Sequence, residues 1–203
     1  MPFYKHNGQL IFFAHVPKCA GTSVTEYLEN RFGPPAFEDR AYRRDPAPFP
    51  WTKTSPQHVT VAALERMVPL QFFDCQFAVV RHPVARLASV FQFQKRNQRQ
   101  IGRLVSFERW LKSLPNVLAK DPYRFDGHAL PQSAFVPPSA DVFRLEDGLT
   151  PLSGYLDERF GASGSELDFG HSKKARSKLK IKTAHEDLIR EIYAEDFDRF
   201  GYT

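Results

Sequence analysis

Hydrophobic and polar positions in the first part of the chain alternate between short apolar runs and longer amphipathic segments. Residues 10–16 form a compact apolar run, which is typical of a strand buried in a parallel sheet. Residues 22–32 carry apolar side chains at helical spacing along one face, and a Gly-Pro-Pro sequence at 33–35 ends this predicted helix. A second buried strand at 77–80 leads into another helix, whose first turn accommodates Pro83 because its N–H would be unpaired there anyway.

The rest of the chain continues the alternation. We predict a short helix at 61–67 capped by Thr60, a helix through residue 114 capped by Ser106, a strand at 142–145, a helix at 152–160 and a final amphipathic helix at 184–200. Residues 33–56 are rich in proline and lack periodicity, which predicts a long functional loop. Alternating strands and helices predict a single α/β domain over residues 1–203, with a central parallel sheet flanked by helices.

Composition narrows the class of protein. With 42% hydrophobic and 25% charged residues, the chain has the composition of a soluble globular protein. Its longest uncharged apolar run is too short to cross a bilayer, and no signal peptide precedes that run. Cys19 and Cys75 are too few cysteines for a disulfide scaffold, so we expect a cytoplasmic protein in a reducing compartment.

The net charge of +5 and the pI of about 9.2 favour an anionic partner without specifying it. Basic residues gather in two clusters, at 95–103 and at 171–182. A solvated helix face or loop explains the first cluster. A nucleic-acid binder therefore has to be weighed against an enzyme that acts on a phosphorylated ligand.

The segment HVPKCAGTS, at 15–23, joins the first predicted strand to the first predicted helix. The first N–H groups of a helix have no partner within it, and the helix dipole favours negative charge at this end. Gly21 lets the backbone approach a ligand, Thr22 and Ser23 add hydroxyl donors, and Lys18 adds a positive charge. An ordinary turn with a solvated lysine and a threonine cap has a similar composition, so this segment alone favours an anion site only modestly.

This turn differs from the Walker A loop of metal-dependent kinases and NTPases. The first glycine of that loop is absent, and Lys18 precedes the glycine instead of following it. No hydrophobic strand ends in an aspartate suited to hold magnesium. We therefore expect no metal, and a nucleotide-dependent, kinase-like phosphotransferase is the less favoured of the enzyme hypotheses.

The second strand–helix unit, FAVVRHPVARLASVF, has the same features: an apolar strand, a basic residue at its end and a helix that carries a hydroxyl. Arg81 ends the strand, and Ser89 follows on the helix. In a parallel sheet, Arg81 lies at the same edge as the first turn, where ligands gather. An arginine and a hydroxyl suit a second phosphate. Arg86, one turn beyond Arg81, is a candidate either for the ligand or for an intramolecular ion pair. Two anion cradles at one edge suggest a nucleoside with phosphates at both ends.

HVPKCAGTS and VVRHPVARLASVF resemble the two signature segments of the sulfotransferases that use 3′-phosphoadenosine 5′-phosphosulfate (PAPS). The resemblance is closest to the branch of carbohydrate sulfotransferases that contains the heparan 2-O- and chondroitin 4-O-enzymes. HALPQSAFV and IYAEDFDRFGY are similar to later stretches of that branch. Cys19 stands where a threonine is common, and His82 where an aspartate or asparagine is common. The resemblance implies a P-loop-like nucleotide-binding core.

The resemblance also implies roles for individual residues. Lys18 acts beside the bridging oxygen of the 5′-phosphosulfate, and Arg81 and Ser89 bind the 3′-phosphate. The donors around the 5′-phosphosulfate are Lys18, Ala20, Gly21, Thr22 and Ser23. The products are then a sulfated acceptor and 3′,5′-adenosine bisphosphate (PAP).

Sulfuryl transfer requires a base for the acceptor hydroxyl, and histidine is suited to this at neutral pH. His58, in SPQHVT, occupies the place where this branch keeps its basic histidine, so we predict His58 and Lys18 as the catalytic residues. His128, in DGHALPQ, is the alternative base or an acceptor contact. His15 precedes the first cradle and is expected to orient it.

The predicted acceptor is a hydroxyl on a carbohydrate or another small metabolite, bound between segments 33–56 and 121–140. Trp51, Tyr123 and Phe125 are candidates to stack on a sugar ring. The basic segment 172–182 is either a solvated loop or one that closes over the nucleotide through Lys173, Lys174 or Arg176, the latter as the resemblance implies. We expect neither a nucleic-acid nor a membrane partner. A non-catalytic nucleotide or nucleic-acid binder remains an alternative to the enzyme.

Overall fold

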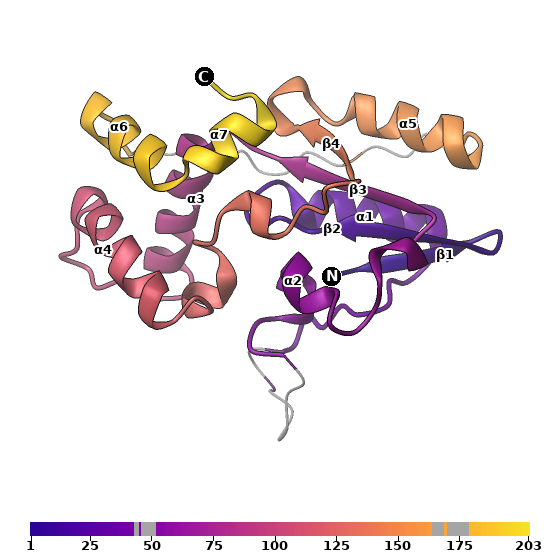
Figure 1. Ribbon diagram of the computed structural model, residues 1–203, viewed down its shortest axis with the longest axis horizontal. Helices are drawn as coiled ribbons and strands as arrows, with labels where there is room; N and C mark the ends of the chain where they lie inside the picture. The colour runs from indigo at the N-terminus through magenta and orange to yellow at the C-terminus, as the bar shows by residue number, and fades with distance from the viewer. Residues whose placement is uncertain (43–44, 46–51, 164–168, 170–178) are drawn as a thin grey trace.

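The computed structural model describes residues 1–42, 45, 52–163, 169 and 179–203. Its sheet has four strands in the order β1-β2-β3-β4 (Figure 1). They are β1 (Phe3–His6), β2 (Gln9–Ala14), β3 (Cys75–Val80) and β4 (Asp141–Arg144). Strands β2, β3 and β4 are parallel, whereas β1 is antiparallel to β2. The predicted α/β fold is confirmed, with a sheet that is mixed because of β1.

Strand β1 was missed by the sequence analysis. It is short and only partly buried, so it has neither a continuous apolar run nor a clear alternation. The turn to β2 is made by Asn7 (φ 50°) and Gly8 (φ 83°), both left-handed. Asn-Gly is the pair that a tight hairpin turn favours, because both of its central residues need positive φ. This dipeptide was the available signal for the hairpin.

The parallel register places the ends of β2 and β3 at one edge of the sheet. Ile11 pairs with Cys75, and Ala14 pairs with Ala78. The chain therefore leaves both strands at nearly the same level, and the segments that follow β2 and β3 lie at the carboxyl edge, where α/β proteins bind ligands.

Seven α-helices occur in the described part of the chain, and several contact each other beside the sheet. Helices α3, α4 and α6 lie together on the left in Figure 1, and α5 lies at the upper right, above β3. Their bounds are α1 (Gly21–Phe32), α2 (Val61–Leu64), α3 (Pro83–Arg96), α4 (Phe107–Lys120), α5 (Thr150–Phe160), α6 (Thr183–Ile192) and α7 (Ala194–Phe200).

The caps predicted for two helices are present. The Thr60 side chain accepts a hydrogen bond from Ala63 N–H at the start of α2, and Ser106 accepts one from Arg109 N–H at the start of α4. Helix α4 continues past its predicted end to Lys120, with Pro115 inside it. A strongly amphipathic face, with Trp110 buried, favours continuing the helix despite the proline.

The predicted single C-terminal helix is instead two helices, α6 and α7, separated at Tyr193. Tyr193 leaves the helical conformation (φ −119°, ψ 31°), and its buried hydroxyl donates to Ala129 C=O. Helix α7 then presents Asp196 to the backbone of segment 132–133. The break therefore reflects tertiary contacts that helical periodicity does not report.

The core lies on both faces of β2 and β3. Phe13 and Phe77, on neighbouring strands, stack with ring centroids 5.4 Å apart, and Tyr155 of α5 packs on Phe77. Within the ranges that the structure describes, every helix falls short of the length and apolar character that a bilayer crossing requires.

Candidate active site

The turn between β2 and α1 has a strained backbone and an uncapped helix start. Lys18 (φ 69°) and Ala20 (φ 61°) are both left-handed, which is unusual for residues other than glycine. No side chain caps α1, and its first hydrogen bond runs from Val24 N–H to Ala20 C=O. The N–H groups of Gly21, Thr22 and Ser23 therefore have no partner within the helix. This is the arrangement expected of an anion cradle.

Gly21 has a packing role in addition to the one predicted. A Cβ atom at this position would lie 1.8 Å from Nε2 of His15. The His15 ring thus fills the space that a side chain at position 21 would need, and it stacks on Phe13 at 5.4 Å. Only glycine allows His15 to pack against the first turn of α1.

Lys18 and Arg81 are neighbouring cations at the ends of β2 and β3. The ammonium of Lys18 lies 4.0 Å from the centre of the Phe93 ring. Burial, and then the positive charge of Arg81, lower the pKa of Lys18 below its ordinary value. Among the described residues, no carboxylate lies within ion-pair distance of either side chain. Two adjacent cations without an acidic partner make a site that favours an anion.

The backbone of Arg81 is fixed by a buried glutamine. Gln132 accepts from Arg81 N–H at 2.9 Å and donates to Arg81 C=O at 2.8 Å. The same side-chain oxygen lies 3.3 Å from the Cys19 sulfur in the first cradle. Gln132 therefore joins the two predicted cradles, a connection that the sequence analysis did not identify.

The other predicted nucleotide contacts lie on α1 and α3. Thr22 is exposed, Ser23 is buried, and Ser89 is half-buried in the second turn of α3. The next residue after Arg81, His82, donates its N–H to Glu146 at 2.9 Å. Glu146 also accepts from the Tyr202 hydroxyl at 3.0 Å, so its carboxylate has a structural role.

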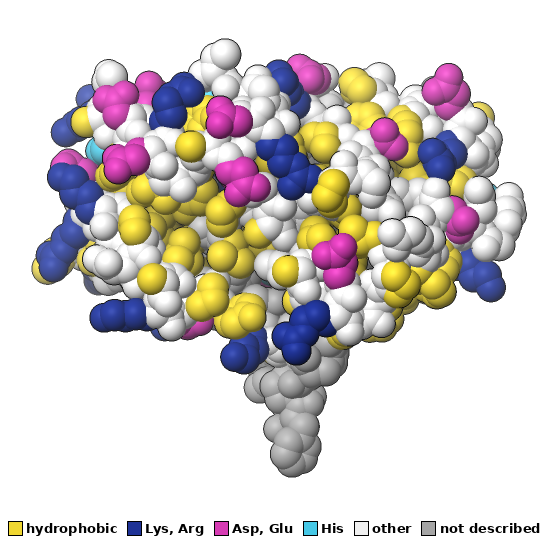
Figure 2. All heavy atoms as spheres, viewed as in Figure 1, with side chains coloured by type: hydrophobic (Ala, Val, Ile, Leu, Met, Phe, Trp, Pro, Cys, Tyr) yellow, Lys and Arg dark blue, Asp and Glu magenta, His cyan; other side chains and the backbone are white. Residues whose placement is uncertain are grey.

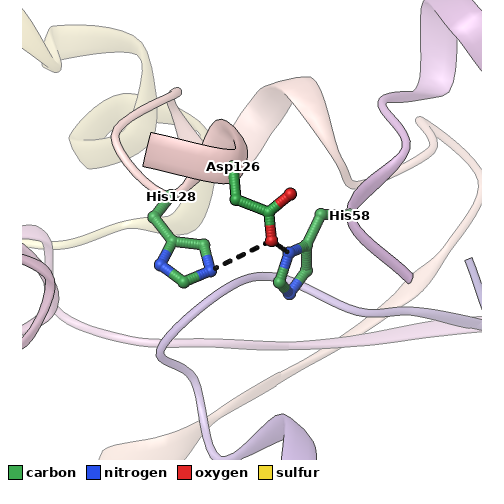
Figure 3. A group of neighbouring side chains, drawn as sticks. All are labelled: His58, Asp126 and His128. Carbon is green, nitrogen blue, oxygen red and sulfur yellow. Dashed lines mark hydrogen bonds and ion pairs between the residues drawn. The ribbon is translucent and has the colours of Figure 1, made fainter. Parts of the chain in front are cut away.

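The two candidate bases meet at one carboxylate (Figure 3). His58 ends a short 3-10 helix, Pro56–His58, and His128 follows another, Arg124–Gly127. Nδ1 of His58 lies 2.9 Å from Oδ2 of Asp126, and Nε2 of His128 lies 3.9 Å from the same oxygen. The two rings are 4.8 Å apart, between centroids.

Asp126 is held by further donors, and its pKa reflects them. Its carboxylate accepts from Ser55 N–H at 2.6 Å and from the Ser55 hydroxyl at 2.7 Å. Burial alone would raise the pKa of Asp126, but the hydrogen bond and charge of His58 and the two bonds from Ser55 hold this pKa well below its usual range. The carboxyl group is therefore ionised at neutral pH.

His15 completes a cluster of three histidines, which we call the histidine cluster (His15, His58 and His128). Its ring centroid lies 5.3 Å from that of His58. Burial, and then the neighbouring His58, lower the pKa of His15 and that of His128 well below the ordinary value. Both rings are therefore neutral at neutral pH. Because His15 also touches Gly21, the cluster lies directly against the first anion cradle.

Buried polar side chains anchor the segment that carries His128. Arg86 donates to the carbonyl groups of His128 and Leu130. Asp196 accepts from Gln132 N–H and Ser133 N–H, at 2.9 Å each. The two roles considered for Arg86 were both wrong, because its guanidinium binds backbone carbonyls and its side chain is buried.

The predicted acceptor contacts differ in exposure. Tyr123 is 37% exposed, and the Lys53 ammonium lies 5.2 Å from its ring centre. Phe125 is only 6% exposed and packs on Trp110, so it cannot offer a face to a sugar ring, and this prediction was wrong. Trp51 and the basic residues Lys173, Lys174 and Arg176 lie outside the described residues.

Sequence reasoning missed Asp126. It stands two residues before His128, in DGH, and 68 residues after His58. A carboxylate next to a candidate base was a usable signal for His128. Its pairing with His58 had no sequence signal, because this contact depends on how two loops meet.

A parallel α/β core, with an uncapped helix start and two cations at its carboxyl edge, is the architecture of proteins that bind anionic ligands at this edge. The comparison with family models specifies the family: the model described as "Sulfotransferase family" matches residues 3–203. The chain therefore belongs to the sulfotransferase family, as its two signature segments predicted. Neither the curated proteins nor the solved structures gave a match.

Proposed function

We propose that the protein transfers a sulfuryl group from PAPS to a hydroxyl group of a carbohydrate or another small metabolite. Family membership supports sulfuryl transfer in general. The observation that supports this donor is the pair of cations Lys18 and Arg81, which meet at the carboxyl edge of the sheet. Within the described part of the chain, neither has a carboxylate at ion-pair distance.

In this proposal the two cradles hold the two ends of the donor nucleotide. The N–H groups at the start of α1 and the Thr22 and Ser23 hydroxyls receive the 5′-phosphosulfate. Arg81 and Ser89 receive the 3′-phosphate. The fixed backbone of Arg81, held by Gln132 on both sides, sets the distance between the two cradles. A preorganised site of this kind costs little rearrangement when the charge develops.

The transfer step breaks one S–O bond and forms another. The acceptor hydroxyl oxygen attacks sulfur, its proton passes to a base, and the bond from sulfur to the 5′-phosphate oxygen breaks. Lys18 and the start of α1 stabilise the negative charge that builds on the leaving phosphate. His58 is the proposed base, and it reaches this site because the histidine cluster lies against Gly21.

The acceptor side of the site is assigned to two segments, one carrying Lys53 and the other carrying Tyr123. Their cation–π contact leaves the tyrosine ring partly exposed, as stacking on a sugar would require. A carbohydrate acceptor, and membership of the carbohydrate branch, are part of the proposal. A cytoplasmic location is also part of the proposal. The free, buried thiols of Cys19 and Cys75 are consistent with a reducing compartment.

On one face of the molecule, the distribution of charge does not favour a nucleic-acid partner. On the face drawn in Figure 2, lysine and arginine side chains are interspersed with acidic ones and form no continuous basic stripe. Proteins that bind nucleic acid through phosphate contacts usually gather their cations on one surface.

The test is calorimetry with PAP, with ATP and magnesium, and with a short oligonucleotide, followed by a transfer assay with radiolabelled PAPS and a panel of hydroxyl acceptors. We expect saturable PAP binding without magnesium and transfer of label to at least one acceptor class. Tight binding of ATP that depends on magnesium would point to a phosphotransferase. Oligonucleotide binding with a steep salt dependence, and no transfer, would point to a nucleic-acid binder.

A further inference from the structure

We propose that Asp126 and Gln94 are positioning residues that fix where the protons of His58 and His128 lie, so that His58 alone presents a free ring nitrogen, Nε2, to the acceptor. This inference deepens the proposed function and rests on it for its catalytic consequence. Its structural content, the two tautomers, can be tested without any activity.

Gln94 determines the tautomer of His128. Its side chain is fully buried, and Nε2 lies 3.2 Å from Phe125 C=O and 2.9 Å from Nδ1 of His128. A carbonyl oxygen can only accept, so the amide NH2 of Gln94, and not its oxygen, must face Phe125. The same NH2 then faces Nδ1 of His128, which must accept and carries no proton. Neutral His128 is therefore protonated on Nε2.

That proton points toward Asp126. Nε2 of His128 lies 3.9 Å from Oδ2 of Asp126, a distance for a long-range attraction and not a full hydrogen bond. With Nδ1 bonded to Gln94 and Nε2 protonated, His128 has no nitrogen lone pair left to accept a proton. This removes His128 as the base and leaves it as a neutral donor beside the site.

Asp126 determines the tautomer of His58. An ionised carboxylate only accepts hydrogen bonds, and this one already receives the N–H and O–H of Ser55. Nδ1 of His58, at 2.9 Å, must therefore carry a proton and donate it. The lone pair of His58 is then on Nε2. When Nε2 takes the acceptor's proton, the carboxylate stabilises the resulting imidazolium and remains ionised itself.

The backbone that carries Asp126 is strained in a way that fits this role. Phe125 (φ 63°, ψ 27°) and Asp126 (φ 59°, ψ 35°) are left-handed in succession, and Gly127 (φ 71°) follows. Such a sequence of conformations persists only where its surroundings enforce it, and it occurs most often at functional sites. Here it directs Phe125 C=O to Gln94 and the Asp126 carboxylate to Ser55 and His58.

The same hydrogen bonds argue against a metal at this cluster. His58, Asp126 and His128 offer ligand atoms within 4.8 Å of one another, a set that could in principle hold a cation. A metal would need a lone pair on Nε2 of His128. Because Gln94 donates to Nδ1, the ring proton occupies Nε2 and this lone pair is absent. A metal would also displace the short bond between His58 and Asp126. The hydrogen bonds of this cluster therefore suit proton transfer and not metal binding.

The first experiment reads the tautomers directly. The protein is labelled with ¹⁵N-histidine, and long-range ¹H–¹⁵N spectra are recorded at neutral pH, with His58→Gln and His128→Gln to assign the signals. We expect a protonated Nδ1 in His58 and a protonated Nε2 in His128. The opposite tautomer in either ring overturns the inference, whether or not the protein transfers sulfuryl groups. Added Zn²⁺ should leave both sets of shifts unchanged, and metal-type shifts would also overturn it.

The second experiment tests the consequence with Asp126→Asn and Gln94→Met, each beside a matched control, Asp187→Asn on the exposed side of α6 and Gln98→Met. Asp126→Asn should lower kcat about 100-fold or more and leave the KM for PAPS within about twofold, because only the proton transfer is affected. The acidic limb of its pH–rate profile should move to lower pH. Gln94→Met should give mixed His128 tautomers. Both controls should behave as the parent protein.

These readouts separate the two proposals. Correct tautomers in a protein that neither binds PAP nor transfers label leave the inference on protonation in place and defeat the proposed function. Transfer activity with an unchanged pH–rate profile in Asp126→Asn defeats the inference and leaves the proposed function in place. If Asp126→Asn does not fold, the spectra of the parent protein still decide the question.

Discussion

At the scale of single residues, Lys18 combines a cation, partial burial and a left-handed backbone. Its ammonium lies over the Phe93 ring, where burial lowers its pKa. An ammonium in this environment gains most when negative charge develops beside it, because the surrounding groups screen charge less than water does. This favours a role in stabilising the leaving phosphate over a role in holding the bound nucleotide.

Lys18→Ala should therefore lower kcat by about 100- to 1,000-fold, the range for removing one stabilising donor. The Kd for PAP should rise less than about tenfold. Steady-state kinetics and calorimetry measure the two quantities. Lys112→Ala is the matched control, since Lys112 is exposed and forms an ion pair with Glu108 on the surface of α4. Equal loss of turnover and of PAP affinity would contradict a role confined to the leaving group.

Arg81→Ala should weaken PAP binding by about 2–4 kcal/mol, the scale of removing one partner from a bound charge pair. Adenosine 5′-phosphosulfate has no 3′-phosphate, so its affinity should hardly change. Calorimetry with both ligands gives the comparison, and Arg96→Ala, at the end of α3, serves as control. If both ligands weaken alike, Arg81 supports the fold of the sheet edge and does not bind the 3′-phosphate.

His58→Ala should cut the rate at least about 100-fold with PAP binding unchanged, because the base faces the acceptor. The parent rate should fall as pH falls, since a protonated base cannot accept the acceptor's proton, and this acidic limb should be missing in His58→Ala. His128→Ala should keep the limb. A pH–rate series on all three proteins decides between the two histidines, and loss of the limb in His128→Ala alone would show that His58 is not the base.

At the scale of elements, the junction of β2 and α1 depends on Gly21, which has no side chain. Because His15 occupies the Cβ position of Gly21, the turn and the histidine cluster fit together as one unit. The register of β2 with β3 then places Arg81 opposite this unit. The site is therefore built on strand ends and helix starts, which are more rigid than free loops.

Gly21→Ala should lower the free energy of unfolding by about 1–3 kcal/mol, the usual cost of overpacking a filled site. It should also weaken PAP binding, because the start of α1 must move. Urea unfolding and calorimetry measure both. In the His15→Ala background the same substitution should cost much less, since the clashing ring is gone. A cost that is the same in both backgrounds would mean that His15 does not set the requirement for glycine.

At the scale of the whole molecule, buried neutral histidines couple stability to pH. The folded-state pKa values of His15 and His128 lie below the unfolded value of about 6.5, so the unfolded chain binds more protons below that pH. The pKa of Asp126 is also lowered, so its contribution is complete at neutral pH and is lost only as pH falls through about 4 and below. All three groups favour the folded state at neutral and higher pH.

The free energy of unfolding should therefore decrease as pH falls from about 7 to 5, by at most about 1.4 kcal/mol per pH unit for each of the two histidines. Urea unfolding at several pH values gives this slope. His128→Gln should make the slope clearly smaller, and Gln98→Met, which removes no titratable group, should leave it unchanged. Because slopes are compared, any loss of packing in the variants does not affect the result. A slope independent of His128 would contradict its burial in the neutral form.

The local features of this protein could be predicted from its sequence alone. The apolar runs predicted β2 and β3, and the Gly-Pro-Pro and Ser106 signals predicted where helices end or begin. The two signature segments predicted the family that the family comparison confirmed. These features depend on neighbouring residues, through backbone conformation, capping and burial of a continuous run, so they can be read along the chain.

The contacts between distant segments, in contrast, became known only from the three-dimensional fold. The break at Tyr193 and the bonds of Arg86 each depend on partners distant in sequence. The pairing of His58 with Asp126 joins two loops separated by 68 residues. Such contacts form because buried polar groups must find partners once the core has brought them together, and many sequences would satisfy them equally well. Their geometry therefore leaves no periodic trace in the sequence.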